Sequence, residues 1–464
     1  MTARDPFVLA AFQYLGPNGT VGAGWYEEED RSADFLTLGH WTSLARRLDE
    51  AGFDFLFLAD SHGWPAVDGQ PHPAAVREGR GVPQADPVTV ISALAAVTER
   101  LGFVVTSSTT VERPAALARR LATLDHFCSG RLGWNIVTGS NGASAAALMG
   151  EDLISHDLRY DMAEDYLELC LGLWEGTWRT DAYRRDPSTR TWADPDGVRA
   201  LTHEGPYFRS HGILNLPPSP QRTPLLVQAG SSGRGLAYAG RNAEAVFVAG
   251  GDPLVVARRV AAIRRAAADA GRDPRSVKVL AGVMLLAAET SAEAHARHTR
   301  MLERSTLQGA AAVFAGNTGV DLLQFPLDRP LPPDLTTDQG LSNLQRYLGT
   351  PEQPGPTVAQ ILEDFRTTGL NGTVIAGDPE EVVDGAVAFA DATDVDGFLL
   401  QPDLVPGTFE AVADLVVPVL RERGLAREAP TGATLREHLF GEGHRWLAGD
   451  HHGSGRRWVA PAEV

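Results

Sequence analysis

The stretch Gly130–Asn141, GRLGWNIVTGSN, places an apolar run directly before a polar cluster. The run from Leu132 to Val137 is apolar at nearly every position, which predicts a strand that is buried on both faces. Asn135 is an amide inside this run, and Thr138 begins the polar cluster that ends it. Polar groups are unusual at the carboxyl end of a buried strand, so they indicate a specific structural or functional role.

Seven more apolar runs of strand length occur along the chain, and they alternate with segments of helical periodicity. The runs are Phe7–Gln13, Phe53–Asp60, Leu101–Thr110, Pro224–Gly230, Ala243–Gly250, Ser276–Ala288 and Val395–Pro402. The helical segments include Leu38–Gly52, Asp86–Arg100, Arg113–Gly130, Asp157–Gly176, Ser232–Asn242, Pro253–Gly271, Asp378–Thr393 and Thr408–Gly424. About eight strand–helix units in series predict an α/β fold, a (β/α)8 TIM barrel with insertions, rather than an open doubly wound sheet.

Two intervals interrupt this alternation, near residues 177–223 and 315–356. The first contains turn signals and a hairpin-like piece, and the second is rich in Pro and Gly and is a candidate lid over a pocket. Barrels with insertions reach 464 residues as one domain. We therefore predict a single barrel domain over residues 1–440, followed by a C-terminal tail over residues 441–464.

The composition is typical of a soluble globular protein, with 43% hydrophobic and 22% charged residues. The formal net charge of −18 argues against a nucleic-acid or anionic-membrane partner, because both require a basic surface. The chain shows neither a signal-peptide pattern at its start nor a run of about 18 apolar residues. Cys128 and Cys170 are expected to be inert core thiols, so cytoplasmic residence is the expectation.

Polar residues collect where five of the predicted strands end. These segments are Asp60–His62, Thr106–Ser108, Asn135–Asn141, Gln228–Ser232 and Gln401–Asp403. Because the strands of a barrel end at one face, we expect these groups to line one pocket. Their amides and hydroxyls favour a neutral heteroaromatic ligand, with a phosphate near Gly230–Ser232 at the start of a helix. Ordinary helix capping is the alternative at any single strand end.

A second group of candidates lies in SHDLRYDMAEDY, residues 155–166. His156 and Tyr160 are four positions apart, so they share one face at the start of a helix and can contact the same object. Arg159 can reach a carboxylate or a phosphate. The alternative is that His156 is a loop residue and Tyr160 a core residue.

Other possible sites have weaker support. His444, His451 and His452 lack the spacing of a metal motif, so we predict no metal site and expect a solvated tail. A hydrolase is not indicated, because the chain contains no G-x-S-x-G motif. The acidic run Glu27–Asp30 is interpreted as a solvated face.

Three segments closely resemble one family of enzymes. They are LATLDHFCSGRLGWNIVTGS (121–140), HDLRYDMAEDYLELCLGLWEG (156–176) and the stretch from His203 to Phe247. Together with FDFLFLAD (53–60) and TLREHL (434–439), they resemble the bacterial luciferase-like flavin monooxygenases. Within that family, the chain looks like the subgroup of nitrilotriacetate monooxygenase component A, dibenzothiophene-sulfone monooxygenase and long-chain alkane monooxygenase.

This resemblance implies a TIM barrel that binds reduced FMN supplied by a separate NAD(P)H:flavin reductase. With dioxygen as co-substrate, such an enzyme oxygenates a small organic substrate through a flavin hydroperoxide. The family also implies a homodimer or homotetramer. A deazaflavin-dependent oxidoreductase on the same fold is the first alternative, and a non-catalytic flavin-binding protein is the second.

The resemblance also implies individual site residues. The flavin-contacting positions of the family correspond here to Asp60, Thr106, His156, Tyr160 and Ser231. Strand-end positions that line the same flavin correspond to Asn135, Thr138 and Gly230. His156 and Tyr160 are the predicted catalytic residues, which would hold the flavin and assist proton transfer. Under this interpretation, the polar end of the opening strand is part of a flavin site.

Overall fold

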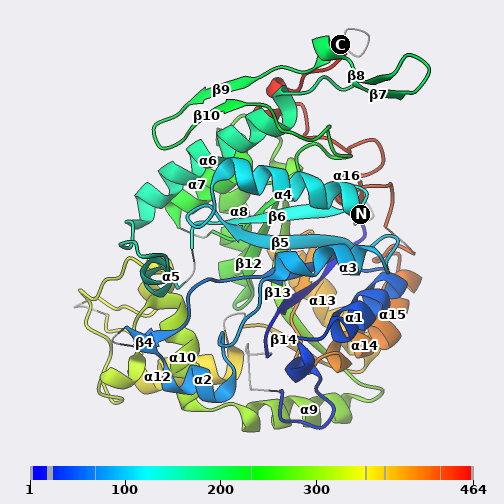
Figure 1. Ribbon diagram of the computed structural model, residues 1–464. Helices are drawn as coiled ribbons and strands as arrows, with labels where there is room; N and C mark the ends of the chain where they lie inside the picture. Colours follow the sequence, from blue (N-terminus) through cyan, green and yellow to red (C-terminus); the bar gives the residue numbers. More distant parts are fainter. Residues whose placement is uncertain are drawn as a thin grey trace.

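The structure, a computed structural model, describes residues 4–17, 24–67, 69–139, 141–230, 232–350, 353–369, 372–428 and 430–460 (Figure 1). Its centre is a closed barrel of parallel strands, in which each strand pairs with the next and the last pairs with the first. In order around the barrel the strands are β1 (Val8–Tyr14), β2 (Phe55–Ala59), β5 (Gly102–Ser108), β6 (Leu132–Val137), β11 (Leu225–Gln228), β12 (Ala245–Ala249), β13 (Lys278–Ala287) and β15 (Gly397–Leu400). The predicted TIM barrel is confirmed.

Helices surround the barrel on its outside, as Figure 1 shows. They are α1 (Leu38–Ala51), α3 (Ile91–Ala95), α4 (Pro114–Phe127), α6 (His156–Gly176), α7 (Gly233–Asn242), α8 (Pro253–Asp269), α9 (Ser291–Arg304), α13 (Pro379–Thr393), α14 (Gly407–Ala411) and α15 (Val417–Glu422). Local signals fix several of their ends. Gly52 ends α1 in the left-handed conformation, with φ of 78°. Asp378 and Glu381 form a capping box at the start of α13.

Side chains alternate between the barrel interior and the helix layer, and this alternation explains the opening strand. Trp134 points outward, where its ring lies 6.1 Å from that of Trp174 on α6. Asn135 points the other way, and together with Thr106 of β5 it lines a cavity at the end of the barrel. The amide therefore lies on the inner face of a strand whose outer face packs against helices.

The amino-terminal end of the barrel is filled by a helix from the far end of the sequence. α16 (Leu435–Phe440) packs Leu435 and Leu439 among the inward side chains of the strands. Its neighbour Arg436 is buried and bonds Glu244 through Nε at 2.6 Å. Because this end is filled with side chains, a ligand site in the barrel has to open at the carboxyl ends of the strands.

The first insertion contains more strand than the sequence predicts. The expected hairpin is present as β9 (Leu201–Glu204) and β10 (Arg209–Gly212), and a second hairpin, β7 (Tyr183–Asp186) with β8 (Thr191–Ala193), precedes it. Both hairpins lie at the top of Figure 1, away from the barrel mouth. The short pair β3 (Ala66–Val67) and β4 (Gln70–Pro71) lies in the segment after β2.

The second insertion builds a small helical unit beside the mouth. It comprises α10 (Leu307–Thr318), α11 (Leu341–Gln345) and α12 (Val358–Thr368), which share an apolar cluster around Phe314 and Phe365. α2 (Pro73–Glu78) and α5 (Gly142–Met149) lie on the same side of the molecule (Figure 1). After this unit, β14 (Val374–Gly377) pairs with the second half of β13 as an additional parallel strand, which the sequence does not predict.

The expectation of a solvated tail is wrong for most of the described part of residues 441–460. His451 is 1% exposed, and its Nε2 lies 2.9 Å from the backbone oxygen of Asn242. Arg457 bonds the buried carboxylate of Glu175 at 3.1 Å. These contacts attach the tail to α6 and α7, and only His444 of the three histidines is exposed.

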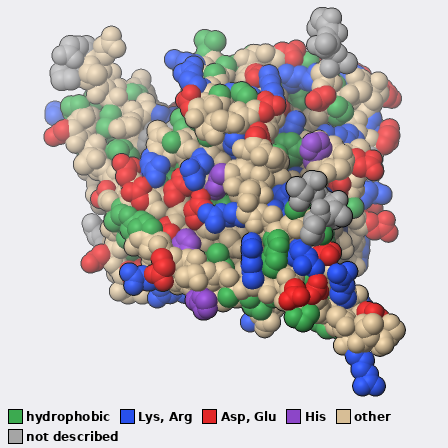
Figure 2. Space-filling model, turned by 90° about the horizontal axis from the view of Figure 1, so that it is seen from above, with side chains coloured by type: hydrophobic (Ala, Val, Ile, Leu, Met, Phe, Trp, Pro, Cys, Tyr) green, Lys and Arg blue, Asp and Glu red, His purple; other side chains and the backbone are tan. Residues whose placement is uncertain are grey.

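The acidic run near the N-terminus and the two cysteines are both partly or wholly buried. Asp30, at the end of the acidic run, is buried and accepts a hydrogen bond from the backbone N–H of Val405 at 2.8 Å, so this residue is not solvated as expected. Cys128 and Cys170 are buried free thiols, as predicted. Over the face in Figure 2, acidic and basic side chains are interspersed. Within the described ranges, no helix is long and apolar enough to span a membrane.

Candidate functional site

Two adjoining cavities occupy the carboxyl-terminal mouth of the barrel. The β5–β6 cavity has a volume of about 270 Å³, and Asp60, Thr106 and Asn135 contribute to its wall. The β12–β15 cavity has a volume of about 440 Å³ and extends from β12 and β15 toward α8 and the residues after α11. Both are lined by Phe12, Tyr14, Phe57, Ala229 and Asn317. Together they have the size expected for a cofactor and a small substrate.

The floor of the mouth is aromatic. Phe12 stacks on Phe57 with ring centroids 5.5 Å apart, and Phe57 meets Phe247 edge to face at 4.7 Å. These rings come from β1, β2 and β12, at inward positions of the strands. A floor of this kind excludes water and offers an apolar surface to a flat ligand.

Asn135 has an incomplete set of hydrogen bonds. The residue is 4% exposed, and its Nδ2 donates to Thr106 Oγ1 at 2.9 Å. Its Oδ1 has no hydrogen-bond partner among the described residues. Leaving a buried carbonyl oxygen unpaired costs about 1–3 kcal/mol. A group that tolerates this cost in a cavity wall is suited to accept a hydrogen bond from a ligand.

Asp60 and His62 lie close together just after the end of β2. Nδ1 of His62 lies 4.0 Å from Oδ2 of Asp60, and the carboxylate side chain is 13% exposed. Burial raises the pKa of Asp60 to about 6, and the neighbouring His62 opposes that rise. Asp60 can therefore gain or lose a proton under mildly acidic to neutral conditions, at the wall of the β5–β6 cavity.

Tyr160 lies between the end of β11 and the start of α7. Its hydroxyl is 3.5 Å from Gln228 Nε2, and a Cβ on Gly230 would lie 2.8 Å from it. Burial raises the pKa of Tyr160, so the hydroxyl stays protonated at neutral pH. The ring of His156 lies 5.2 Å from that of Tyr160, which confirms that the two share a helix face. His156 is the outermost of the predicted residues and bonds Asp157 at 2.8 Å.

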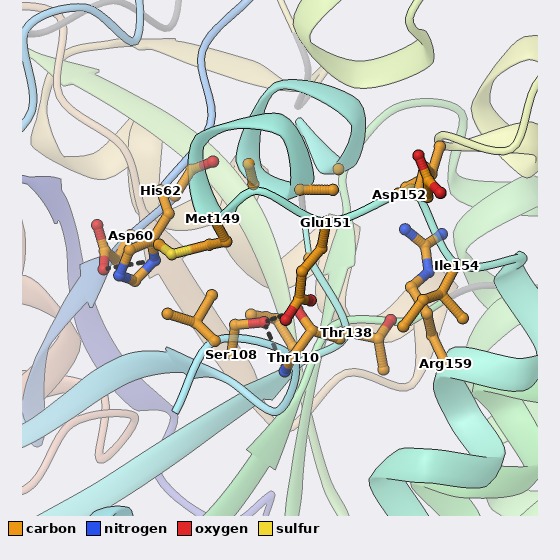
Figure 3. A pocket seen from close by; sticks show the side chains of 18 of the residues that line it. Asp60, His62, Ser108, Thr110, Thr138, Met149, Glu151, Asp152, Ile154 and Arg159 are labelled. Atoms are coloured by element: carbon orange, nitrogen blue, oxygen red, sulfur yellow. Dashed lines mark hydrogen bonds and ion pairs between the residues drawn. The ribbon is translucent and has the colours of Figure 1, made fainter. Parts of the chain in front are cut away.

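A third, small pocket lies beneath α5, next to the β5–β6 cavity (Figure 3). It is lined by Thr138 and also by Asp60 and Thr106, which line the larger cavity as well. Its volume of about 40 Å³ accommodates only a few water molecules. The buried Arg159 closes one side and donates to the backbone oxygen of Asp338 at 2.9 Å rather than to a carboxylate.

The structure therefore brings most of the predicted residues to one mouth. Asp60, Thr106, Asn135 and Gly230 line the larger cavities, Thr138 lines the pocket beside them, and Tyr160 packs against Gly230. His156 lies behind Tyr160, and Ser231 lies outside the described residues. Several lining residues were missed by the sequence reasoning, namely Phe12, Tyr14, Asn317, Arg258, Arg259 and Arg346. Strand alternation in β1 indicates the first two, whereas nothing local indicates the arginines.

Residues 20–396 match the family described as luciferase-like monooxygenase. The chain belongs to this family. The match covers most of the chain, including every predicted site residue, and it confirms both the resemblance and the prediction that the protein is an enzyme, a flavin-dependent monooxygenase.

Individual relatives of this luciferase-like monooxygenase cover nearly the whole chain. The protein is 37% identical over 429 residues to a long-chain alkane monooxygenase of Geobacillus thermodenitrificans, and the alignment covers 92% of each chain. It is 34% identical over 438 residues to a dimethyl-sulfide monooxygenase of Hyphomicrobium sulfonivorans, covering 94% of this chain and 91% of the relative. Among solved structures, it is similar to a riboflavin lyase with modified FMN and the substrate riboflavin, at 39% identity and a TM-score of 0.92, covering 98% of this chain and 100% of the other.

Proposed function

We propose that this protein is the oxygenase component of a two-component system. It would take reduced FMN from a separate reductase and use dioxygen to oxygenate a small organic substrate. The observation that carries this proposal is the aromatic-floored mouth of the barrel, with the unpartnered amide oxygen of Asn135 in its wall. The two monooxygenases named above support oxygen transfer as the class of reaction.

The residues at the mouth fit FMN in three respects. The isoalloxazine ring carries an N–H on its pyrimidine edge, and the unpartnered Oδ1 of Asn135 is an acceptor for such a donor. Its flat apolar face suits the floor formed by Phe12 and Phe57. The phosphate of FMN suits the start of α7, where the side chain of Ser232 caps the helix and Gly230, which has no side chain, leaves the backbone accessible.

When bound, reduced FMN would supply the electrons that activate dioxygen. The chain's own groups would position the reactants and handle protons. Asp60 Oδ2, with its pKa near 6, can hold or release a proton at the cavity wall. The protonated hydroxyl of Tyr160 can donate a hydrogen bond beside Gly230. His156 would orient Tyr160 through ring contact.

The proposal is tested first by equilibrium binding. The protein is titrated anaerobically with reduced FMN and, separately, with a reduced deazaflavin, and we expect clear preference for FMN. It is then mixed with FMN, a flavin reductase, NADH and air, together with a panel of sulfides, amines, alkanes, alkyl carboxylates and alkyl phosphates. Incorporation of one atom from labelled dioxygen into a product is the expected result. Preference for deazaflavin, or no oxygenated product from any panel member, would overturn the proposal.

Two substitutions separate proton transfer from positioning. Tyr160→Phe removes only the hydroxyl, and a general acid or base at this position contributes about 10²–10⁴-fold to turnover. Proton transfer by the hydroxyl predicts a fall of about 10²-fold in kcat, whereas a hydroxyl that only holds the phosphate beside Gly230 would raise the Kd for reduced FMN and leave kcat unchanged. His156→Ala is expected to produce a smaller loss of kcat, because the imidazole acts through Tyr160. An unchanged kcat in both variants would remove these residues from the catalytic machinery.

A further inference from the structure

The β12–β15 cavity has three guanidinium groups at its rim and no acidic side chain among its described lining residues. Arg258 and Arg259 come from α8, and Arg346 directly follows α11. Within the part of the chain that the structure describes, none of the three forms an ion pair with a carboxylate. Arg258 donates to its own helix, at the backbone oxygen of Leu254, 3.2 Å away.

This arrangement differs from that of other arginines near the mouth. Arg80 pairs with Glu78 at 2.7 Å, and Arg297 pairs with the buried Asp403 at 3.3 Å. Arg259 is half-buried, and the pKa of its guanidinium is lowered by burial and by the charge of Arg346. Like charges that face one cavity repel each other unless an anion lies between them. In a chain of net charge −18, such a local excess of positive charge calls for a specific counter-charge.

Most of the other lining residues of this cavity are apolar, and Asn317, Asn343 and Gln401 add neutral polar groups. Aromatic rings of Phe12, Phe57, Phe247, Tyr347 and Phe365 line it, together with Leu399. Tyr14 adds no negative charge, because burial raises its pKa to about 12. The volume of about 440 Å³ accommodates a body of moderate size beneath the charged rim. The cavity is therefore suited to a ligand that is apolar at one end and anionic at the other.

The cavity adjoins the place proposed for the flavin, and Gly230, beside the proposed phosphate position, is one of its lining residues. The wall residues Asp60, Thr106 and Asn135 lie at or near the ends of β2, β5 and β6, whereas residues of β12, β13 and β15 line only this cavity. The two share Phe12, Phe57 and Ala229, so an apolar group in the β12–β15 cavity lies next to the place where the flavin ring fits. The arginines lie at the other end, beside α8.

We propose that the substrate is an amphipathic anion, whose carboxylate or phosphate is bound by Arg259 and Arg346 with the help of Arg258. Its apolar body lies on the aromatic rings and reaches the reaction centre. The identification of this ligand as the substrate rests on the proposed function, but its binding does not.

The test compares three ligands that share one alkyl chain: decanoate, decyl phosphate and decanol. The full-length protein is titrated with each by calorimetry below the concentration at which the ligand forms micelles. We expect at least one anion to bind at least tenfold more tightly than decanol. Whichever of decanoate and decyl phosphate binds more tightly identifies the anionic group. Equal binding of all three would overturn the proposal.

Arginine variants locate the site. Arg259→Gln and Arg346→Gln are each expected to reduce the preference for the anion tenfold or more, and Arg259→Lys is expected to keep part of it. Arg265→Gln is the matched control, because Arg265 is an exposed residue of the same helix that does not line this cavity. Circular dichroism confirms that each variant is folded. An anion preference that survives both glutamine variants would overturn the proposal.

Two further measurements separate this inference from its rivals. If Arg259→Gln removes a preference for FMN over riboflavin, the guanidinium groups serve the cofactor phosphate, and the substrate assignment is wrong. If the anion binds with the expected dependence on arginine but reduced FMN does not bind, the proposed function fails while the anion site stands. If the anion does not bind but reduced FMN binds normally, the anion site fails while the proposed function stands.

Discussion

Replacing Asn135 with leucine should weaken the binding of reduced FMN while leaving the stability of the ligand-free protein nearly unchanged. The residue is 4% exposed, its Nδ2 donates to Thr106 at 2.9 Å, and its Oδ1 has no partner among the described residues. Leucine has the same branching at Cγ, and its larger methyl groups can extend into the cavity that Asn135 lines, so Asn135→Leu removes the polar atoms without opening a new cavity. The variant tests whether the orphaned oxygen is maintained for a ligand.

The magnitude follows from the two polar atoms. Leaving the buried hydroxyl of Thr106 without its partner costs about 1–3 kcal/mol, and removing the unpaired buried oxygen of Asn135 recovers about 1–3 kcal/mol. The two terms nearly cancel, so the free energy of unfolding of the ligand-free variant should stay within about 1 kcal/mol of that of the unsubstituted protein. Loss of the acceptor should weaken the binding of reduced FMN by about 1–3 kcal/mol, which corresponds to an increase of roughly 5–150-fold in Kd.

Urea unfolding without ligand and anaerobic titration with reduced FMN measure the two quantities. Thr106→Val is the matched control, because it removes the partner of Nδ2 and leaves both polar atoms of Asn135 unpaired. That variant should be less stable by about 1–3 kcal/mol. If Asn135→Leu loses as much stability as Thr106→Val, or binds reduced FMN as tightly as the unsubstituted protein, the role assigned to Oδ1 is refuted.

Three other perturbations give independent checks. A Cβ on Gly230 would lie 2.8 Å from the hydroxyl of Tyr160, so Gly230→Ala should raise the Kd for reduced FMN about tenfold or more by overpacking. Gly233→Ala is the control, because a Cβ there meets nothing within 4 Å and should leave this Kd unchanged. The pKa of Asp60 rises from 3.8 to about 6 on folding, so ionisation of this carboxyl destabilises the folded protein progressively between these pH values. In urea unfolding, Asp60→Asn should therefore be more stable than the unsubstituted protein above pH 6, by up to about 3 kcal/mol. Below pH 3.8 the two proteins should be equally stable. Leu435 is 0% exposed in the barrel interior, so Leu435→Ala should lower the free energy of unfolding by about 2–5 kcal/mol, and a loss below 1 kcal/mol in the same assay would contradict its role in filling the barrel end.

The sequence alone determined the barrel and much of the residue set at its mouth. Strand burial depends on the spacing of apolar residues, and helix ends depend on local signals such as Gly52, so both can be read within a short window. Because parallel strands in a barrel end at one face, the sequence pattern alone places the polar ends of the strands at one mouth. The family resemblance added the proposals that the mouth binds a flavin and that Tyr160 assists proton transfer.

The tertiary structure decided which groups lack partners and which distant segments meet. The unpaired Oδ1 of Asn135 depends on the register of β6 against β5, which fixes Thr106 as its neighbour. The arginine rim requires α8 and the segment after α11 to converge on one cavity. The packing of α16 and His451 against the barrel likewise joins residues far apart in the chain. Such contacts depend on packing between elements that are remote in sequence, and local patterns carry no information about them.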